Sequence, residues 1–392
     1  MARSRPLFTF LLLIVSACYL VGAGCTSYSE GPGWDESRQD ADLRILSLIA
    51  SEDFAAVLAI TDSLVLEGRD DPRLKGQRGL ALGMTGKVDE ATAIFEESLL
   101  EDYASCENHL NFAVMLMKVG KTGRALTEFR EARRFCGEAN EPMILRNLAV
   151  GQLKMGRVEA ASKLVDEGLS LSSEDSYLLG LKAMLVADSK PVKAESLFVK
   201  SERAGGMNSD FLYQLGLLFL RTGRPSSAAR SLTAVVEERP RDLEVNLNYA
   251  EALIRSGRLD EAGFVLVGMR RWTDDTGVTD KFARVLFRQE KYADALSLFR
   301  ELPGDPETRD RIAMCLHNMG RSSEAIGIQK KVVAERPEWT VGLVNYSAIL
   351  GALGELKEAE KILIRVLQLE PGNATARVNL DILRKAIEES AR

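Results

Sequence analysis

Short glycine-centred turns recur along most of this 392-residue chain, and their spacing limits the folds that it can adopt. Four of the six intervals between them are 34 to 36 residues, and the other two, of 67 and 63, each fit two units with an altered turn between them. The seven turns are Gly86-Lys87, Gly120-Lys121, Gly156-Arg157, Gly223-Arg224, Gly257-Arg258, Gly320-Arg321 and Gly354-Glu355. The altered turns are Ser189-Lys190 and Glu290-Lys291. A fixed period of this length indicates stacked copies of one supersecondary unit rather than two or three globular domains.

The residues around each turn predict two helices that pack closely. Apolar residues recur at helical period before the turn, with a small residue such as Gly79 or Gly216 among them. An alanine follows each turn after four or five residues, namely Ala91, Ala125, Ala161, Ala194, Ala228, Ala262, Ala295, Ala325 and Ala359. Four residues further on there is a large apolar residue in all units but one, where Gln329 stands. Small residues at the crossing point allow two helix axes to approach, so each unit is predicted to be helix, tight turn, helix.

A 34-residue period with small residues at its eighth and twentieth positions and a proline near its thirty-second resembles the tetratricopeptide repeat (TPR). The units that start at Ser209 and Thr340 match this pattern almost position for position. The resemblance implies an all-α fold, a right-handed α-solenoid of about nine to ten helix-turn-helix units. We expect the repeats at 72–373, a degenerate helix pair before them at 41–71 and a capping helix after them at 374–392.

Two units depart from the pattern. Lys182 stands where the unit from Asp175 should have a small residue, and Pro191 lies in the turn of the same unit. The segment Pro303-Gly304-Asp305-Pro306 shortens the unit that begins near Thr276. We expect altered stacking near both.

The first 25 residues are predicted to be an export signal. Arg3 and Arg5 precede an uncharged, mostly apolar run from Leu7 to Gly24, and small residues stand directly before Cys25. This arrangement resembles a bacterial lipobox, in which the cysteine is lipidated and the signal is removed. Cys18 is an alternative lipidation site, and an uncleaved membrane anchor is an alternative to cleavage.

The segment after this signal is polar and rich in turn residues, so we expect a flexible tether at 26–40. A lipoprotein of this kind would be anchored in the bacterial cell envelope and would face the periplasm. Thr26, in the position after the lipidated cysteine where Asp would retain a lipoprotein, fits passage to the outer membrane.

The composition excludes several classes of function. The net charge of −6 argues against nucleic-acid binding, which depends on basic surface. Only two histidines, His109 and His317, are present, and neither has a recognisable metal-binding partner. No phosphate-binding loop, His-Glu-x-x-His or Cys-x-x-Cys motif occurs. We therefore expect no catalytic site, no metal, no cofactor and no small-molecule substrate.

The TPR resemblance also implies a concave groove lined by the first helix of each unit. Family positions carried onto this chain predict a groove that is apolar at first and more charged later. Its predicted residues are Leu110, Val114, Met117, Arg146, Val150, Leu153, Tyr213, Leu217, Leu220, Arg221, Arg255, Arg284 and Arg288. Partner protein or peptide segments would bind there. The alternative is that the apolar members only pack between neighbouring helices.

A ladder of cations occupies the thirteenth position of five units: Lys118, Lys154, Arg221, Arg255 and Arg288. It would suit an acidic partner, or each cation would simply complement the C-terminus of its helix.

Cys106 and Cys136 open and close one unit, and the ends of an antiparallel helix pair are neighbours. Cysteines of exported proteins become oxidised in an oxidising compartment, so we expect a disulfide between these two, with two free thiols as the alternative. Cys315, in an apolar helix, is expected to be a buried small residue.

Lipoproteins built of these repeats resemble the TadD-type assembly factors of Flp and type IV pili. The chain is therefore interpreted as a membrane-anchored scaffold for a cell-envelope machine such as a pilus or secretion system. Two alternatives remain from the sequence: a regulator of a peptidoglycan enzyme, or a component of outer-membrane protein or polysaccharide export.

Overall fold

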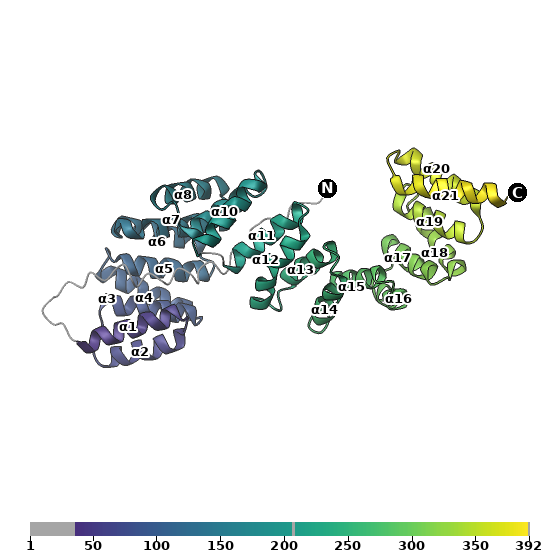
Figure 1. Cartoon of the computed structure of the whole chain (residues 1–392). Helices are drawn as coiled ribbons and strands as arrows, with labels where there is room; N and C mark the ends of the chain where they lie inside the picture. Colours follow the sequence, from purple (N-terminus) through teal and green to yellow (C-terminus); the bar gives the residue numbers. More distant parts are fainter. Residues whose placement is uncertain (1–35, 206–207, 391–392) are drawn as a thin grey trace. The chain divides into compact units, whose positions relative to one another are not determined.

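The described part of the chain folds almost entirely into antiparallel helix pairs (Figure 1). A computed structural model describes residues 36–205 and 208–390, and these ranges contain 21 α-helices and no strand. The lipobox and both candidate lipidation sites, Cys25 and Cys18, lie outside the described residues. The chain forms two compact units, of which the first ends at Leu218 and the second begins at Phe219, and each unit is described by itself.

Unit 1 contains five helix pairs, one 3₁₀ turn and most of helix α11. Its elements are α1 Glu36–Ala50, α2 Phe54–Leu66, α3 Pro72–Met84, α4 Val88–Glu101, α5 Cys106–Lys118, α6 Thr122–Phe135, η2 Glu138–Asn140, α7 Glu141–Lys154, α8 Val158–Leu171, α9 Ser176–Val186, α10 Pro191–Arg203 and α11 Ser209–Arg221. Helix α1 begins at Glu36, within the segment 26–40 that is expected from the sequence to be a tether.

Unit 2 continues from the end of α11 through the remaining pairs to a single last helix. Its elements are α12 Pro225–Glu238, α13 Leu243–Arg255, α14 Leu259–Met269, α15 Thr276–Arg288, α16 Tyr292–Glu301, α17 Pro306–Asn318, α18 Ser322–Glu335, α19 Thr340–Ala352, α20 Leu356–Leu369 and α21 Ala374–Ser390. Within the described ranges no helix is both long and apolar enough to cross a bilayer.

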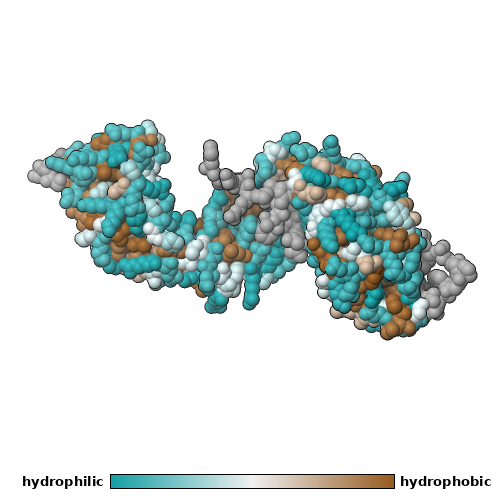
Figure 2. Space-filling model, turned by 180° about the vertical axis from the view of Figure 1, so that it is seen from behind, coloured by the Kyte–Doolittle hydropathy of each residue, from teal (hydrophilic) through white to brown (hydrophobic). Residues whose placement is uncertain are grey.

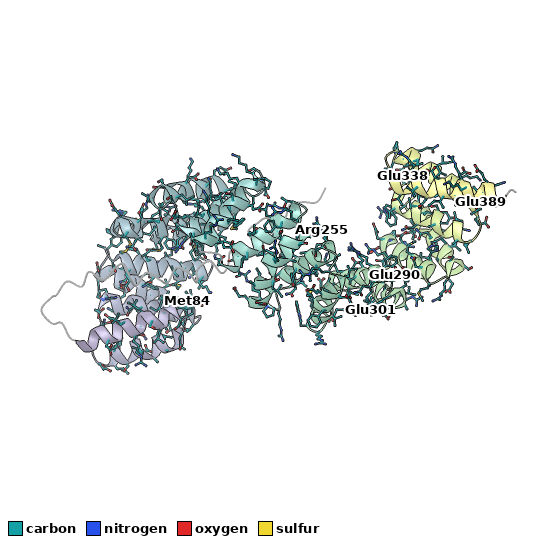
Figure 3. All side chains as sticks on the ribbon, viewed as in Figure 1. Met84, Arg255, Glu290, Glu301, Glu338 and Glu389 are labelled. Carbon is teal, nitrogen blue, oxygen red and sulfur yellow. A yellow bond between two sulfur atoms is a disulfide. The ribbon has the colours of Figure 1, made fainter. Side chains whose placement is uncertain are left out.

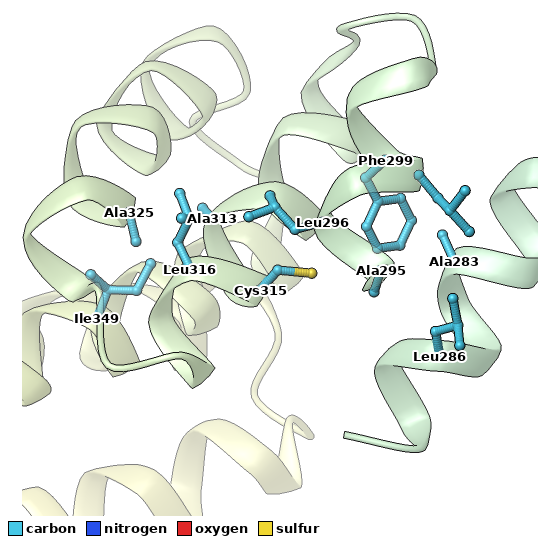
Figure 4. Close-up of a cluster of buried hydrophobic side chains, with 11 residues drawn as sticks. Ala283, Leu286, Ala295, Leu296, Phe299, Ala313, Cys315, Leu316, Ala325 and Ile349 are labelled. Atoms are coloured by element: carbon cyan, nitrogen blue, oxygen red, sulfur yellow. The ribbon is translucent and has the colours of Figure 1, made fainter. Parts of the chain in front are cut away.

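The small-residue contact predicted from the sequence holds each pair together. All nine alanines that follow the turns are fully buried, and the residue four positions after each is at most 2% exposed. Gly79 shows how close the approach is, because a Cβ added there would lie 3.0 Å from the ring of Phe95 on α4. Figure 4 shows the same packing in unit 2, where Ala295 and Phe299 meet Ala283.

The ends of the helices follow from local chemistry. Most first helices begin with a side-chain cap that accepts a hydrogen bond from the backbone N–H three residues on. The capping residues are Asp71, Ser105, Asp175, Asp242, Asp275 and Asp305. The turn glycines adopt positive φ, for example 94° at Gly86, which lets the chain reverse without a Cβ clash.

The departures from the repeat have local solutions. Lys182 on α9 extends toward α8, where its Nζ lies 2.8 Å from the carboxylate of Asp166. The long side chain therefore does not separate α9 from α10. Helix α16 has 10 residues where α4 and α6 have 14, because Leu302 ends it and Asp305 already caps α17. The 36-residue interval before Gly156 is accommodated by η2 between α6 and α7.

A polar cluster inside unit 1 fixes the pair α5–α6. His109 is 1% exposed, with Nδ1 2.8 Å from Glu128 Oε2 and Nε2 2.9 Å from the backbone oxygen of Tyr103. Phe135 stacks on its ring at 5.8 Å. A carboxylate and a carbonyl accept hydrogen bonds, so this arrangement favours the imidazolium form of His109, in which both ring nitrogens donate.

The turn between α15 and α16 leads to a first prediction. Glu290, labelled in Figure 3, occupies the position of the turn glycines and has a φ of 61°. An L-residue in this conformation is strained by roughly 1–2 kcal/mol, so Glu290→Gly should raise the free energy of unfolding by about 1 kcal/mol. Thermal unfolding measures this. Lys291→Gly, at a φ of −82° in the same turn, is the control and should not stabilise; equal effects would contradict the strain at Glu290.

The His109 cluster leads to a second prediction. Burial by itself lowers the pKa of His109, but the hydrogen bonds with Glu128 and Tyr103 and the charges of Glu128 and Glu131 outweigh it and raise the pKa above 6.5. A pKa raised by folding gives stability that is complete below pH 6.5 and is lost as the pH rises through the folded value. The urea midpoint should therefore fall between pH 6 and pH 9.

The matched variant for this prediction is His109→Gln, which carries no titrating group. Its urea midpoint should depend less on pH over the same range. The difference in the free energy of unfolding is about 1.4 kcal/mol for each unit by which folding raises the histidine pKa. An identical pH dependence in the two proteins would show that His109 is not the charged group described here.

Candidate functional site

A pocket of about 290 Å³ lies among the helices α15, α16, α17 and α19 of unit 2. Two charged residues one turn apart on α15, three residues of α17 and one amide of α19 supply most of its wall, and aromatic rings supply the rest. The lining residues are Arg284, Phe287, Arg288, Phe299, Asp310, Arg311, Met314 and Asn345. The repeat produces this convergence, because the corresponding faces of successive first helices carry these residues.

Two of the arginines are positioned by Asp280, which lies outside the pocket lining. Arg311 Nη1 lies 2.6 Å from Asp280, and its guanidinium is 5.9 Å from the ring centre of Phe299. Arg284 Nη1 lies 3.6 Å from the same aspartate, and about half of its side chain is exposed. The pocket therefore combines three cations with an apolar floor of Phe287, Phe299 and Met314.

The one acidic residue of the lining is almost buried. Asp310 is 5% exposed and accepts hydrogen bonds from Gln329 Nε2 at 2.6 Å and from Asn345 Nδ2 at 2.9 Å. Burial raises the pKa of the Asp310 carboxyl above its ordinary value, because it outweighs these hydrogen bonds and the charge of Arg311. Gln329, the exception in the sequence pattern, also donates to the backbone oxygen of Gly342 at 3.0 Å.

The structure brings only part of the predicted groove to this pocket. Arg284 and Arg288 line it, whereas Phe287, Phe299, Arg311, Met314 and Asn345 were not predicted as site residues. Gln329 was the one sequence feature that indicated this pocket. A buried amide needs polar partners, and the polar residues Asp310 and Asn345 lie near it on first helices.

The apolar part of the predicted groove is almost fully buried in the structure. Its members are 1% to 7% exposed, namely Leu110, Val114, Met117, Val150, Leu153, Tyr213 and Leu220. Met117 illustrates the reason, because its sulfur lies 3.7 Å from the position a Cβ would take at Gly151 on α7. The packing alternative describes these residues. Leu217 is half-buried, and the Arg146 guanidinium lies 4.7 Å from the ring centre of Tyr177.

The cation ladder has two kinds of members. Arg255 Nη1 donates to the backbone oxygen of Leu220 at the end of α11, at a distance of 2.8 Å. Arg288 Nη1 donates to the backbone oxygen of Ile254 on α13, at 3.0 Å. These arginines cap the preceding first helices. Lys118 and Lys154 have no hydrogen-bond or ion-pair partner among the described residues, and burial and then the charge of Lys118 lower the pKa of Lys154. Arg221 is exposed.

Two further residues of reactive types, Cys315 and His317, lie on α17. Cys315 is fully buried, and burial raises the pKa of its thiol to about 12. His317 Nδ1 lies 3.0 Å from Ser322 Oγ, and burial lowers the pKa of this histidine. Within the described ranges no three His, Cys, Asp or Glu side chains are grouped to hold a metal ion.

Comparisons with known proteins place the repeat most clearly at the middle of the chain. Residues 213–264 match the tetratricopeptide repeat family. No curated protein matches the chain. The P58(IPK) TPR domain is 17% identical, with a TM-score of 0.34, over 90% of this chain and 99% of its own.

Two further solved structures show similar levels of likeness. Pseudomonas aeruginosa pilF is 17% identical, with a TM-score of 0.42, over 53% of this chain and 96% of its own. A human IFIT1 dimer with PPP-AAAA is 16% identical, with a TM-score of 0.46, over 85% of each chain.

The helix pairs, their buried small-residue contacts and the matched repeat define the class of this protein. The described residues form an all-α solenoid of helix pairs, and residues 213–264 of it match the tetratricopeptide repeat. Such repeats generally serve as non-enzymatic scaffolds that bind protein or peptide segments.

The capping arginines give a third prediction. Arg255→Ala removes a charge-assisted hydrogen bond to the end of α11 and should lower the free energy of unfolding by about 1 kcal/mol. Lys118→Ala, at the same repeat position without such a bond, should change it by less than about 0.5 kcal/mol. Thermal unfolding of both variants measures the difference, and equal losses would contradict a capping role specific to Arg255.

Proposed function

We propose that this protein is a lipid-anchored scaffold that holds protein partners outside the cytoplasm. The observation that carries the scaffold is the accessible charged pocket of unit 2, lined by Arg284, Arg288 and Arg311. The Arg284 side chain is about half exposed, and a group of cations at an accessible pocket favours a partner of complementary charge.

The anchor and the compartment are proposed from the sequence and from one covalent feature. The small residues before Cys25 support lipidation there, with Cys18 as the alternative. In the structure Cys106 and Cys136 form a disulfide with a Cα–Cα distance of 5.0 Å, as expected from their places at the two ends of one repeat. Disulfides persist in oxidising compartments, which supports export.

The partners are proposed to belong to a cell-envelope machine such as a pilus or a secretion system. The resemblance of the lipobox and repeat architecture to TadD-type assembly lipoproteins supports this proposal. A peptidoglycan enzyme, or the outer-membrane protein or polysaccharide export machinery, is the second candidate class of partner.

Affinity capture of the full chain from cross-linked membranes tests the scaffold. We expect pilus or secretion subunits among the eluted proteins. A peptidoglycan enzyme or an export component instead would favour the second class, and no envelope protein at all would contradict the proposal.

Metabolic labelling with an alkyne fatty acid tests the anchor: the label should be lost in Cys25→Ala and kept in Cys18→Ala. Loss in neither variant would exclude both lipidation sites.

Thiol counting gives a prediction for the compartment. Full chain purified from membranes has Cys25 blocked by lipid and Cys18 removed with the signal. After denaturation without reductant it should show one thiol, that of Cys315, and after reduction three. The control Cys106→Ser should show two thiols in both conditions. Three thiols before reduction would contradict the disulfide and the support it gives to export.

A further inference from the structure

The chemistry of the unit 2 pocket defines the kind of segment that fits it. Its lining carries three guanidinium groups and one nearly buried carboxylate, so a ligand meets a positive wall. Asp280, which pairs with Arg311 and Arg284, lies outside the lining and leaves part of the Arg284 guanidinium exposed. Such a wall favours a carboxylate, which arginine binds in a bidentate geometry.

The floor of the pocket favours an apolar group beside that carboxylate. Phe287, Phe299 and Met314 face a volume of about 290 Å³, near the lower limit of small-ligand pockets. A methionine adapts to different shapes, and aromatic rings gain from contact with another flat or branched side chain. Most of the surface seen in Figure 2 is hydrophilic, with separate hydrophobic patches.

Asp310 fixes one further element of recognition. Because an ionised carboxylate only accepts hydrogen bonds, it orients the amide nitrogen of Asn345 toward itself, with contacts of 2.9 and 3.1 Å to its two oxygens. The amide oxygen of Asn345 is then the atom left for the pocket. Gln329, fully buried, also donates to Asp310 Oδ1, at 2.6 Å. The pocket thus offers one oriented acceptor, suited to a backbone N–H of a bound segment.

We propose that the pocket binds an internal segment of a partner protein in which an Asp or Glu is adjacent to a bulky apolar residue. The carboxylate lies against Arg284 and Arg311, the apolar side chain enters over the half-buried Phe287 and Met314, and a backbone N–H donates to Asn345. This proposal rests on the proposed scaffold function and adds the chemistry of the partner. Binding to the unit 2 pocket does not require the partner's C-terminal carboxylate, because the carboxylate of an Asp or Glu side chain supplies the negative charge.

Selection from a phage-displayed library of random 12-residue peptides tests the proposal on the full chain in detergent. In such a library the peptide is displayed at a coat-protein N-terminus, so its C-terminus is not free. Selected peptides should be enriched in Asp or Glu next to Phe, Leu or Met. Synthetic copies with both ends blocked should lose about tenfold or more in affinity when the acid becomes its amide or the apolar residue becomes Ala.

Matched variants of the protein connect this binding to the pocket. Arg284→Glu, chosen because about half of that side chain is exposed, should weaken the selected peptides about tenfold or more while circular dichroism and thermal unfolding stay unchanged. Arg230→Glu, an exposed arginine on α12 outside the lining, should bind them as the unchanged protein does. Met314→Glu should abolish the apolar preference.

Three results would overturn the inference: no acidic–apolar enrichment, equal binding by Arg284→Glu, or displacement of the peptides only by peptides with a free C-terminus. Its failure is distinguishable from failure of the scaffold. Partner capture that is unaffected by Arg284→Glu leaves the scaffold intact and rejects this pocket, whereas capture that yields no envelope protein rejects the scaffold whatever the peptides show.

Discussion

The rest of the structure depends on one contact, in which an alanine after each turn meets the preceding helix and a large residue fills the space four positions later. Ala295 and Phe299 are typical, and every alanine of the series is fully buried. Because this contact sets the distance between two helices, it also sets where the outward faces of successive pairs lie. The position of the binding surface therefore follows from packing, and its side chains differ between units while the contact is kept.

This separation explains what could be predicted from the sequence. The period, the pairs and the buried positions are determined by local spacing, so Ala91 to Ala359 and their partners were predicted correctly. Exposure is not local. Val150 and Leu153 occupy family groove positions, yet they are buried, since neighbouring helices approach closely enough to cover them. The pocket itself depends on Asp310, Gln329 and Asn345 from three helices, a network that no spacing within one repeat contains.

Equivalent positions in the repeat also have different physical roles. Arg255 and Arg288 complete the hydrogen bonding of the helix before them, while Lys118 at the same position leaves its charge to solvent. A lysine lacks the planar fork that reaches a carbonyl and keeps other donors free. A residue's position in the repeat thus predicts where its side chain lies on the helix. The chemistry of the side chain then decides whether it bonds within the fold or remains accessible to a ligand.

The disulfide between Cys106 and Cys136 has a mechanical consequence. A chain pulled from its two ends lengthens as its repeats unfold, but the segment between these cysteines, which are 30 positions apart, stays closed as a covalent loop. At roughly 3.5 Å for each extended residue, the loop withholds about 100 Å of contour length from extension. Helices α5 and α6 therefore form a section of the solenoid whose reach under load is set by the redox state of its surroundings.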